Sequence, residues 1–183
     1  MLRTRALAAG LALTVGMGAT TAALAPAALA SPGAPAATGS FHTWRAAQRA
    51  AGFRLKRPTR LHGLTRTGDI VVTRCEVTGQ LRKRNVFASY GKPQHRFLQI
   101  AQNNSGDPCG DFGEAKDLRT VLVHGARATL FGVCGFTGEP SCHKRDIFLF
   151  LIWRHHHVFY VASSHNERAR VLINFARSLR RVG

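Results

Sequence analysis

The clearest pattern in the chain is a pair of strongly apolar runs near its C-terminus. The first covers residues 146–153 and the second residues 158–163, and they are separated by Arg154 and the three histidines His155, His156 and His157. Both alternating sets of side chains in the first run are apolar, which is typical of a strand covered on both sides. The pattern predicts a hairpin whose first strand lies centrally in a sheet.

The residues after this hairpin repeat with helical spacing. Ser164 and Glu167 have the spacing of a capping box, which predicts a helix from Glu167 to Arg181. Its apolar stripe contains Leu172, Ala176 and Leu179, which we expect to be buried, whereas Arg170, Arg177 and Arg181 fall on the opposite stripe.

The preceding chain alternates in short segments separated by turn residues. Strands are predicted at residues 69–77, 85–90, 97–102, 120–123 and 126–134, with a turn at His124-Gly125. A short helix is predicted from Phe41 to Ala51, capped by Ser40 and ended by Gly52, and residues 114–119 suggest one further helical turn. Together with the terminal hairpin, this predicts an α+β domain. Its antiparallel meander sheet has about seven strands, with a short N-terminal helix and a longer C-terminal helix packed on one face.

The first thirty residues have the pattern of a secretory leader. Arg3 and Arg5 precede an apolar stretch, and the small residues Ala28 and Ala30 flank Leu29 before Ser31. We therefore expect a signal peptide at 1–30, a flexible leader at 31–40 and a single domain at 41–183. The expected location is extracellular, with no transmembrane segment in the mature chain.

Charge changes this picture by indicating a partner class. The chain carries 26 Lys and Arg against nine Asp and Glu, a formal net charge of +17. Such a surface favours an anionic cell-wall polymer or lipid head groups, and no specific nucleic-acid recognition is expected. An Arg-rich composition inherited from a GC-rich genome would explain the same charge without any partner. The candidate polyanion-binding residues are Arg170, Arg177, Arg181, Arg82, Lys83 and Arg84.

The four cysteines lie in the part of the chain that remains after leader removal. An even number in an exported chain indicates two disulfides, with three possible pairings. Because short loops close most easily, Cys75–Cys109 and Cys134–Cys142 are favoured. A four-thiolate metal site is the alternative, but no C-x-x-C pair supplies zinc-site spacing.

No catalytic signature stands out. The chain lacks G-x-S-x-G, H-E-x-x-H and phosphate-binding glycine motifs, and its carboxylates are scattered. We therefore expect no catalytic residues, no cofactor and no metal, and we interpret His155, His156 and His157 as a solvated turn. Two alternatives stay open: a secreted hydrolase acting on a polyanion, and a carrier whose cavity is lined by residues such as Phe148, Phe150 and Phe159.

Several local patterns are shared with one family. They are Pro58 followed by Gly63-Leu64, Gly125 to Ala128, Leu151-Ile152-Trp153, Tyr160, and Phe175 to Leu179. Taken together they resemble a small extracytoplasmic domain of unknown function in bacterial envelope and anti-sigma-factor-like proteins, similar to lipoprotein-carrier folds. The resemblance implies a curved antiparallel sheet packed on the terminal helix, without known catalytic residues. The expected function is that of a secreted, non-enzymatic envelope or extracellular binding module.

Overall fold

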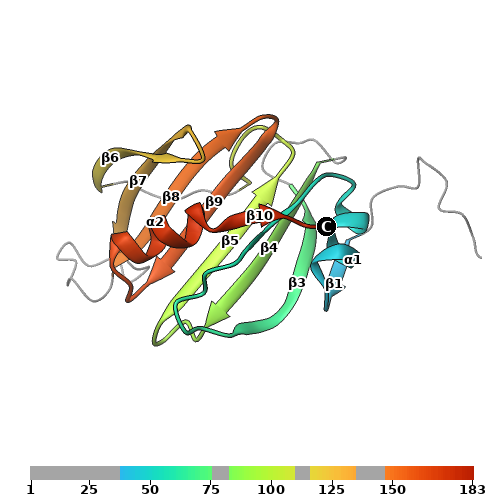
Figure 1. The fold of residues 1–183 in the computed structure, drawn as a ribbon, viewed down its shortest axis with the longest axis horizontal. Helices are drawn as coiled ribbons and strands as arrows, with labels where there is room; N and C mark the ends of the chain where they lie inside the picture. The colour runs from blue at the N-terminus through green and yellow to red at the C-terminus, as the bar shows by residue number, and fades with distance from the viewer. Residues whose placement is uncertain (1–37, 76–82, 110–115, 135–146) are drawn as a thin grey trace, which may run out of the picture. The chain divides into compact units, whose positions relative to one another are not determined.

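The strands pair into one large antiparallel sheet and one small ribbon (Figure 1). The computed structural model describes residues 38–75, 83–109, 116–134 and 147–183. Within these residues, eight strands form the sheet in the order β1-β3-β4-β5-β9-β8-β7-β6, and β10 pairs with β2. The elements are β1 (Gly39–Phe41), α1 (Trp44–Ala51), β2 (Lys56–Pro58), β3 (Arg66–Arg74), β4 (Arg84–Gly91), β5 (Phe97–Asn103), β6 (Lys116–Val123), β7 (Ala126–Cys134), β8 (Ile147–His155), β9 (Val158–His165), α2 (Ala169–Arg177) and β10 (Leu179–Arg181). A mostly antiparallel α+β architecture is confirmed, with one more strand in the sheet than expected.

The sheet is not one continuous meander. Strands β3, β4 and β5 follow one another, but β6 then lies at the far edge, and the chain returns through β7 and β8 to β9. The two halves join where β9 pairs with β5 along its whole length, from Phe97 opposite His165 to Asn103 opposite Phe159. Local alternation predicts that a segment is a strand but not which strand lies beside it, so the single meander was wrong.

One apolar core joins the inward face of the sheet to both helices. Ile100 of β5 and Ala162 of β9 are directly opposite each other and fully buried, and α1 contributes Ala47. From α2, the Phe175 ring meets Tyr90 of β4 edge to face with 5.8 Å between centroids. Figure 1 draws α2 and β10 crossing in front of the sheet. As expected, Leu172, Ala176 and Leu179 are buried, and Arg170, Arg177 and Arg181 are exposed.

The last helix is shorter than the sequence pattern predicts. It covers Ala169–Arg177, and its N-cap, Arg168, makes no side-chain capping bond. Ser164 instead lies in β9, opposite Leu98 and Leu149, so it is held in the ladder and cannot cap the helix. Glu167 forms an ion pair with Arg96, with 2.6 Å between Oε1 and Nε. The capping box was therefore wrong, and Leu179 to Arg181 form a strand because β2 supplies their backbone partners.

Other predicted boundaries also shift. Thr43, not Ser40, caps α1, and its Oγ1 accepts from the Ala46 N–H at 3.2 Å. Ser40 pairs with Val71 in the β1–β3 ladder, which excludes it from the helix end. Gly52 ends the helix in the left-handed region with φ 73°, as predicted. Residues 116–119 are the start of β6 and not a helical turn.

Cys75 and Cys109 form a disulfide with 5.2 Å between their Cα atoms, so the first favoured pairing is confirmed. The second pairing and the leader at 1–30 lie outside the described residues, because Cys142, the Cys134 side chain and residues 1–37 are not described. Among the described residues no helix is long and apolar enough to cross a membrane.

Candidate anion-binding surface

Strands β2 and β10 form a short antiparallel ribbon in which positive charges face each other. Arg180 is directly opposite Arg57, and Arg181 is directly opposite Lys56. We call these four residues the cationic ribbon. Like charges directly opposite in an antiparallel pair repel, so this arrangement costs stability unless something else compensates.

Buried contacts hold the ribbon together despite this repulsion. Pro58 and Leu179, opposite each other at its inner end, are both buried. The buried Gln102 side chain clamps the main chain of Lys56: its Oε1 accepts from the Lys56 N–H at 2.8 Å, and its Nε2 donates to the Lys56 carbonyl at 2.6 Å. The Val182 N–H donates to the Leu55 carbonyl at 3.0 Å and extends the pairing. The charges are therefore presented on a fixed backbone.

Two histidines lie close enough to this positive cluster for its charges to act on them. His124 follows β6 and His155 ends β8. Burial lowers the pKa of His124, and Lys56 and Arg180 lower it further, although a backbone hydrogen bond with Ala176 acts in the opposite direction. Burial also lowers the pKa of His155, with smaller contributions from Lys56, His156, His124 and Arg181. Residues from four separate parts of the chain therefore act on one another here.

An aromatic surface supports Lys56. Its Nζ lies 5.4 Å from the centroid of the Tyr160 ring, and that ring stacks on Trp153 at 5.0 Å. Burial raises the pKa of Tyr160 to about 12, so the phenol stays neutral and its ring face attracts the ammonium. Burial, then Arg181 and Arg180, lower the pKa of Lys56. The Lys56 ammonium thus lies over an aromatic ring.

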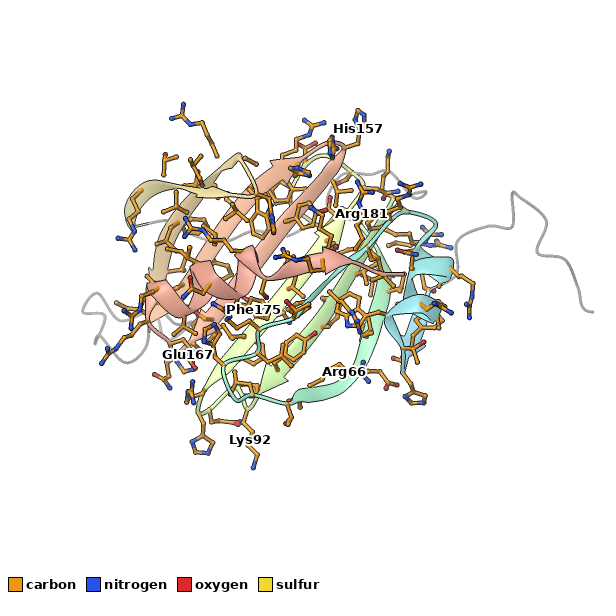
Figure 2. The ribbon with its side chains drawn as sticks, in the orientation of Figure 1. Arg66, Lys92, His157, Glu167, Phe175 and Arg181 are labelled. Carbon is orange, nitrogen blue, oxygen red and sulfur yellow. A yellow bond between two sulfur atoms is a disulfide. The ribbon has the colours of Figure 1, made fainter. Side chains whose placement is uncertain are left out.

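The ion pairs that the described residues form with one another lie away from the ribbon. Among the described side chains, the ion pairs are His42–Asp69 and Arg96–Glu167, and neither involves the cationic ribbon. Glu167 precedes α2 and Arg181 follows it, so the two lie toward opposite ends of this segment (Figure 2). The helix dipole accommodates this polarity, since it favours acids at the N-terminus and cations at the C-terminus.

The candidate residues predicted from the sequence are distributed over several places. Arg170 is exposed on α2, and the Arg177 Nε donates to the Leu122 carbonyl at 3.0 Å. Arg181 belongs to the ribbon and not to a helical stripe. Lys83 is half-buried, Arg84 is buried at the start of β4, and Arg82 lies outside the described residues.

Local sequence patterns do not identify five members of this surface, namely Lys56, Arg57, Arg180, His124 and His155. Their grouping depends on the pairing of two three-residue strands at opposite ends of the domain. The sequence feature that could have indicated this surface is the pair of basic dipeptides, Lys56-Arg57 and Arg180-Arg181. Neither pair has a pattern that indicates a strand partner.

The residues expected for other functions can also be placed. Phe150 lines a hollow of about 230 Å³ on the outer sheet face together with Phe87 and Val161, whereas Phe148 stacks on His165 at 4.4 Å. No group of three metal-ligating side chains occurs in the part of the chain that the structure describes. His155 ends its strand, and the turn itself is His156-His157.

Comparisons with known proteins add no relative. No protein-family model, curated protein or solved structure gives a significant match to this chain.

Proposed function

We propose that this protein is a non-enzymatic binding module that holds an anionic polymer of the bacterial envelope or its surroundings through the cationic ribbon. The observation that carries this proposal is the facing of Arg180 with Arg57 and of Arg181 with Lys56. A protein gains nothing in stability from such pairs, whereas a bound polyanion is attracted by each of them. The two neighbouring histidines add to the attraction when protonated.

Two observations support an extracellular setting. The first is the leader pattern at residues 1–30, and the second is the Cys75–Cys109 disulfide, a bond that persists in oxidising compartments. The resemblance to extracytoplasmic envelope domains is consistent with both. We propose an anionic cell-wall polymer as the partner.

Salt-dependent binding tests the proposal. A fluorescent teichoic acid or heparin is titrated with the protein from about 0.05 to about 0.5 M salt, because polyanion binding releases counterions and weakens with salt. The ribbon double variant Arg180→Gln/Arg181→Gln is expected to lower the slope of log affinity against log salt by roughly two, about one per lost contact.

Two matched controls remove the same charge elsewhere. Arg49→Gln/Arg74→Gln changes exposed arginines of α1 and β3, and Arg170→Gln/Arg177→Gln changes the predicted helix stripe. Both are expected to keep most of the slope. An equal decrease of the salt slope in all three double variants would show that only net charge determines binding. The ribbon would then not be a specific binding site.

A second candidate function is a hydrolase acting on a polyanion. The observation in its favour is the His42–Asp69 pair, with 2.5 Å between Nδ1 and Oδ1. The His42 side chain is 88 % exposed, which leaves it surrounded by water and without a cleft around it. Time-dependent cleavage of the polymer by the parent protein, abolished in His42→Ala, would favour this function over binding alone.

A further inference from the structure

A pocket next to the ribbon combines an aromatic ring with three arginines. It has a volume of about 410 Å³, within the range of small-molecule sites. Trp44 and Val182 supply apolar surface, and the cations that line it are Arg45, Arg57 and Arg66. Figure 2 labels Arg66, the first residue of β3. Of these residues only Arg57 also belongs to the cationic ribbon.

The tryptophan is held in place from behind. Its side chain packs against the hydrophobic core and lies close enough to the Tyr90 hydroxyl to lower the pKa of that phenol. Tyr90 is itself buried, and its ring contacts Phe175. Burial raises the pKa of Tyr90 to about 12, so Tyr90 stays a neutral phenol. The ring of Trp44 is therefore a preformed wall.

Main-chain oxygens orient two of the arginines. Arg66 donates from Nε to the Gly68 carbonyl at 3.2 Å and from a terminal nitrogen to the His42 carbonyl at 2.7 Å. Arg45 donates from Nε to a main-chain oxygen of Gly183 at 3.0 Å. The two internal carbonyl groups fix the Arg66 guanidinium without cancelling its charge, and a guanidinium has five N–H groups. Donors and positive charge are left for a ligand.

This lining selects a ligand by its chemistry. Arginines provide donors and a planar fork that matches carboxylate and phosphate, and the Trp44 ring offers a flat apolar surface. A small inorganic anion would make no use of the Trp44 ring. An uncharged cyclic ligand would make no use of the arginines. A nucleobase carries N–H donors at its edge, which would require acceptors from the protein. Proteins that bind single-stranded nucleic acid also stack several bases on several aromatic rings, whereas this pocket has one.

We propose that the Trp44 pocket binds one anionic sugar unit, in which the sugar ring lies against Trp44 and its phosphate or carboxylate is held by Arg45 and Arg66. This goes beyond the proposed function, because a free monosaccharide would bind here whether or not a polymer binds the ribbon. No covalent step is involved.

The test uses indole signals in two-dimensional NMR spectra of the full chain, which has two tryptophans. Glucose 6-phosphate and glucuronate are each expected to shift the Trp44 signal in a saturable way and to leave the buried Trp153 signal unmoved. Glucose is expected to cause no saturable shift, and inorganic phosphate is expected to bind at least about fivefold more weakly than the sugar phosphate.

Matched variants locate the contact. Arg45→Gln is expected to weaken glucose 6-phosphate about fivefold to tenfold, the usual effect of losing one charge-assisted hydrogen bond at a partly open site. Arg49→Gln removes the same charge from the same helix, away from the pocket lining, and is expected to leave the affinity within about twofold. The unmoved Trp153 signal reports that each variant is folded.

Four outcomes would overturn the proposal. They are equal binding of glucose, equal binding of inorganic phosphate, tighter binding of adenosine monophosphate than of glucose 6-phosphate, and an unmoved Trp44 signal with either anionic sugar. Heparin titration of the same samples separates this proposal from the proposed function. Heparin binding without a Trp44 shift by either anionic sugar would contradict the pocket proposal alone. A saturable Trp44 shift with the anionic sugars but no heparin binding would contradict the proposed function of the ribbon alone.

Discussion

Arg57 of β2 and Arg180 of β10 are directly opposite each other, an arrangement that lowers stability in any antiparallel pair. They are joined through strands of three residues each, whose neighbouring positions Pro58 and Leu179 are buried. The buried pair keeps the strands together and thereby holds the two guanidinium groups at one place.

Reversing one charge should therefore stabilise the protein while weakening polymer binding. Arg57→Glu places an acid opposite Arg180, and we expect the free energy of unfolding to rise by roughly 0.5 kcal/mol at low salt. Denaturant titration at low and at high salt measures this. Arg49→Glu is the control, since Arg49 lies on α1 and has no cross-strand partner. A loss of stability specific to Arg57→Glu would contradict the repulsive pairing.

The clamp on β2 should matter for both stability and binding. Gln102→Leu removes two hydrogen bonds and leaves the main-chain groups of Lys56 without their partners, so we expect a loss of about 2–3 kcal/mol. Gln99→Leu is the control, because Gln99 lies on the same strand and bonds only the Ser89 hydroxyl among the described contacts. Polymer affinity should fall with Gln102→Leu even where the protein remains folded. Unchanged affinity in folded Gln102→Leu would show that the ribbon needs no fixed backbone.

Acidification should destabilise the free protein and strengthen polymer binding. The pKa values of His124 and His155 are lowered in the folded state, so the unfolded chain takes up protons first as the pH falls through the ordinary histidine range near about 6.5. Stability contributed by these groups is full above that range and is lost below it. A bound anion favours the protonated rings, so affinity should rise from about pH 7.5 to about pH 5.5.

Thermal unfolding and polymer titration over this pH range measure the two effects. The charged groups acting on the rings are Lys56, His156, Arg180 and Arg181, and His124 also acts on His155. The double variant His124→Gln/His155→Gln should flatten both dependences, whereas His95→Gln, an exposed residue elsewhere, should retain them. If the double variant and His95→Gln show the same pH dependence of stability and affinity, groups other than His124 and His155 cause it.

The disulfide should stabilise the protein by restricting its unfolded chain. Cys75 and Cys109 are 34 residues apart, so Cys75→Ser/Cys109→Ser is expected to cost roughly 3 kcal/mol in denaturant titration. The parent protein treated with reductant should approach the variant in stability. Uptake of an alkylating label at Cys75 or Cys109 without reductant would contradict the pairing.

Features that depend on neighbouring residues could be predicted from the sequence. The β8–β9 hairpin, the turn at His124-Gly125 and the left-handed Gly52 each follow from a local pattern and agree with the structure. The capping box failed because Ser164 has strand partners on both sides, and the ladder overrides a local capping preference. A local sequence pattern cannot show that strand pairing with distant residues competes with helix capping for Ser164.

The candidate site was less predictable for the same physical reason. Lys56 and Arg181 meet only because the chain after α2 turns back onto β2, and three-residue strands have too few positions to show a period. Arg181 was identified as a candidate, but the helical pattern placed it beside Arg177. Excess charge indicated a class of partner, whereas the position of the surface required the fold.

The pairing of β9 with β5 also determines when the sheet can be completed. During synthesis β5 emerges with one edge paired to β4, but its second partner, β9, ends only at His165, after β6, β7 and β8 have been made. Until then that edge offers unpaired backbone groups to other chains, a recognised route to aggregation. A contact of such long sequence separation also slows folding. Because β10 follows β9 and α2 along the chain, the second strand of the ribbon is synthesised only after every strand of the large sheet.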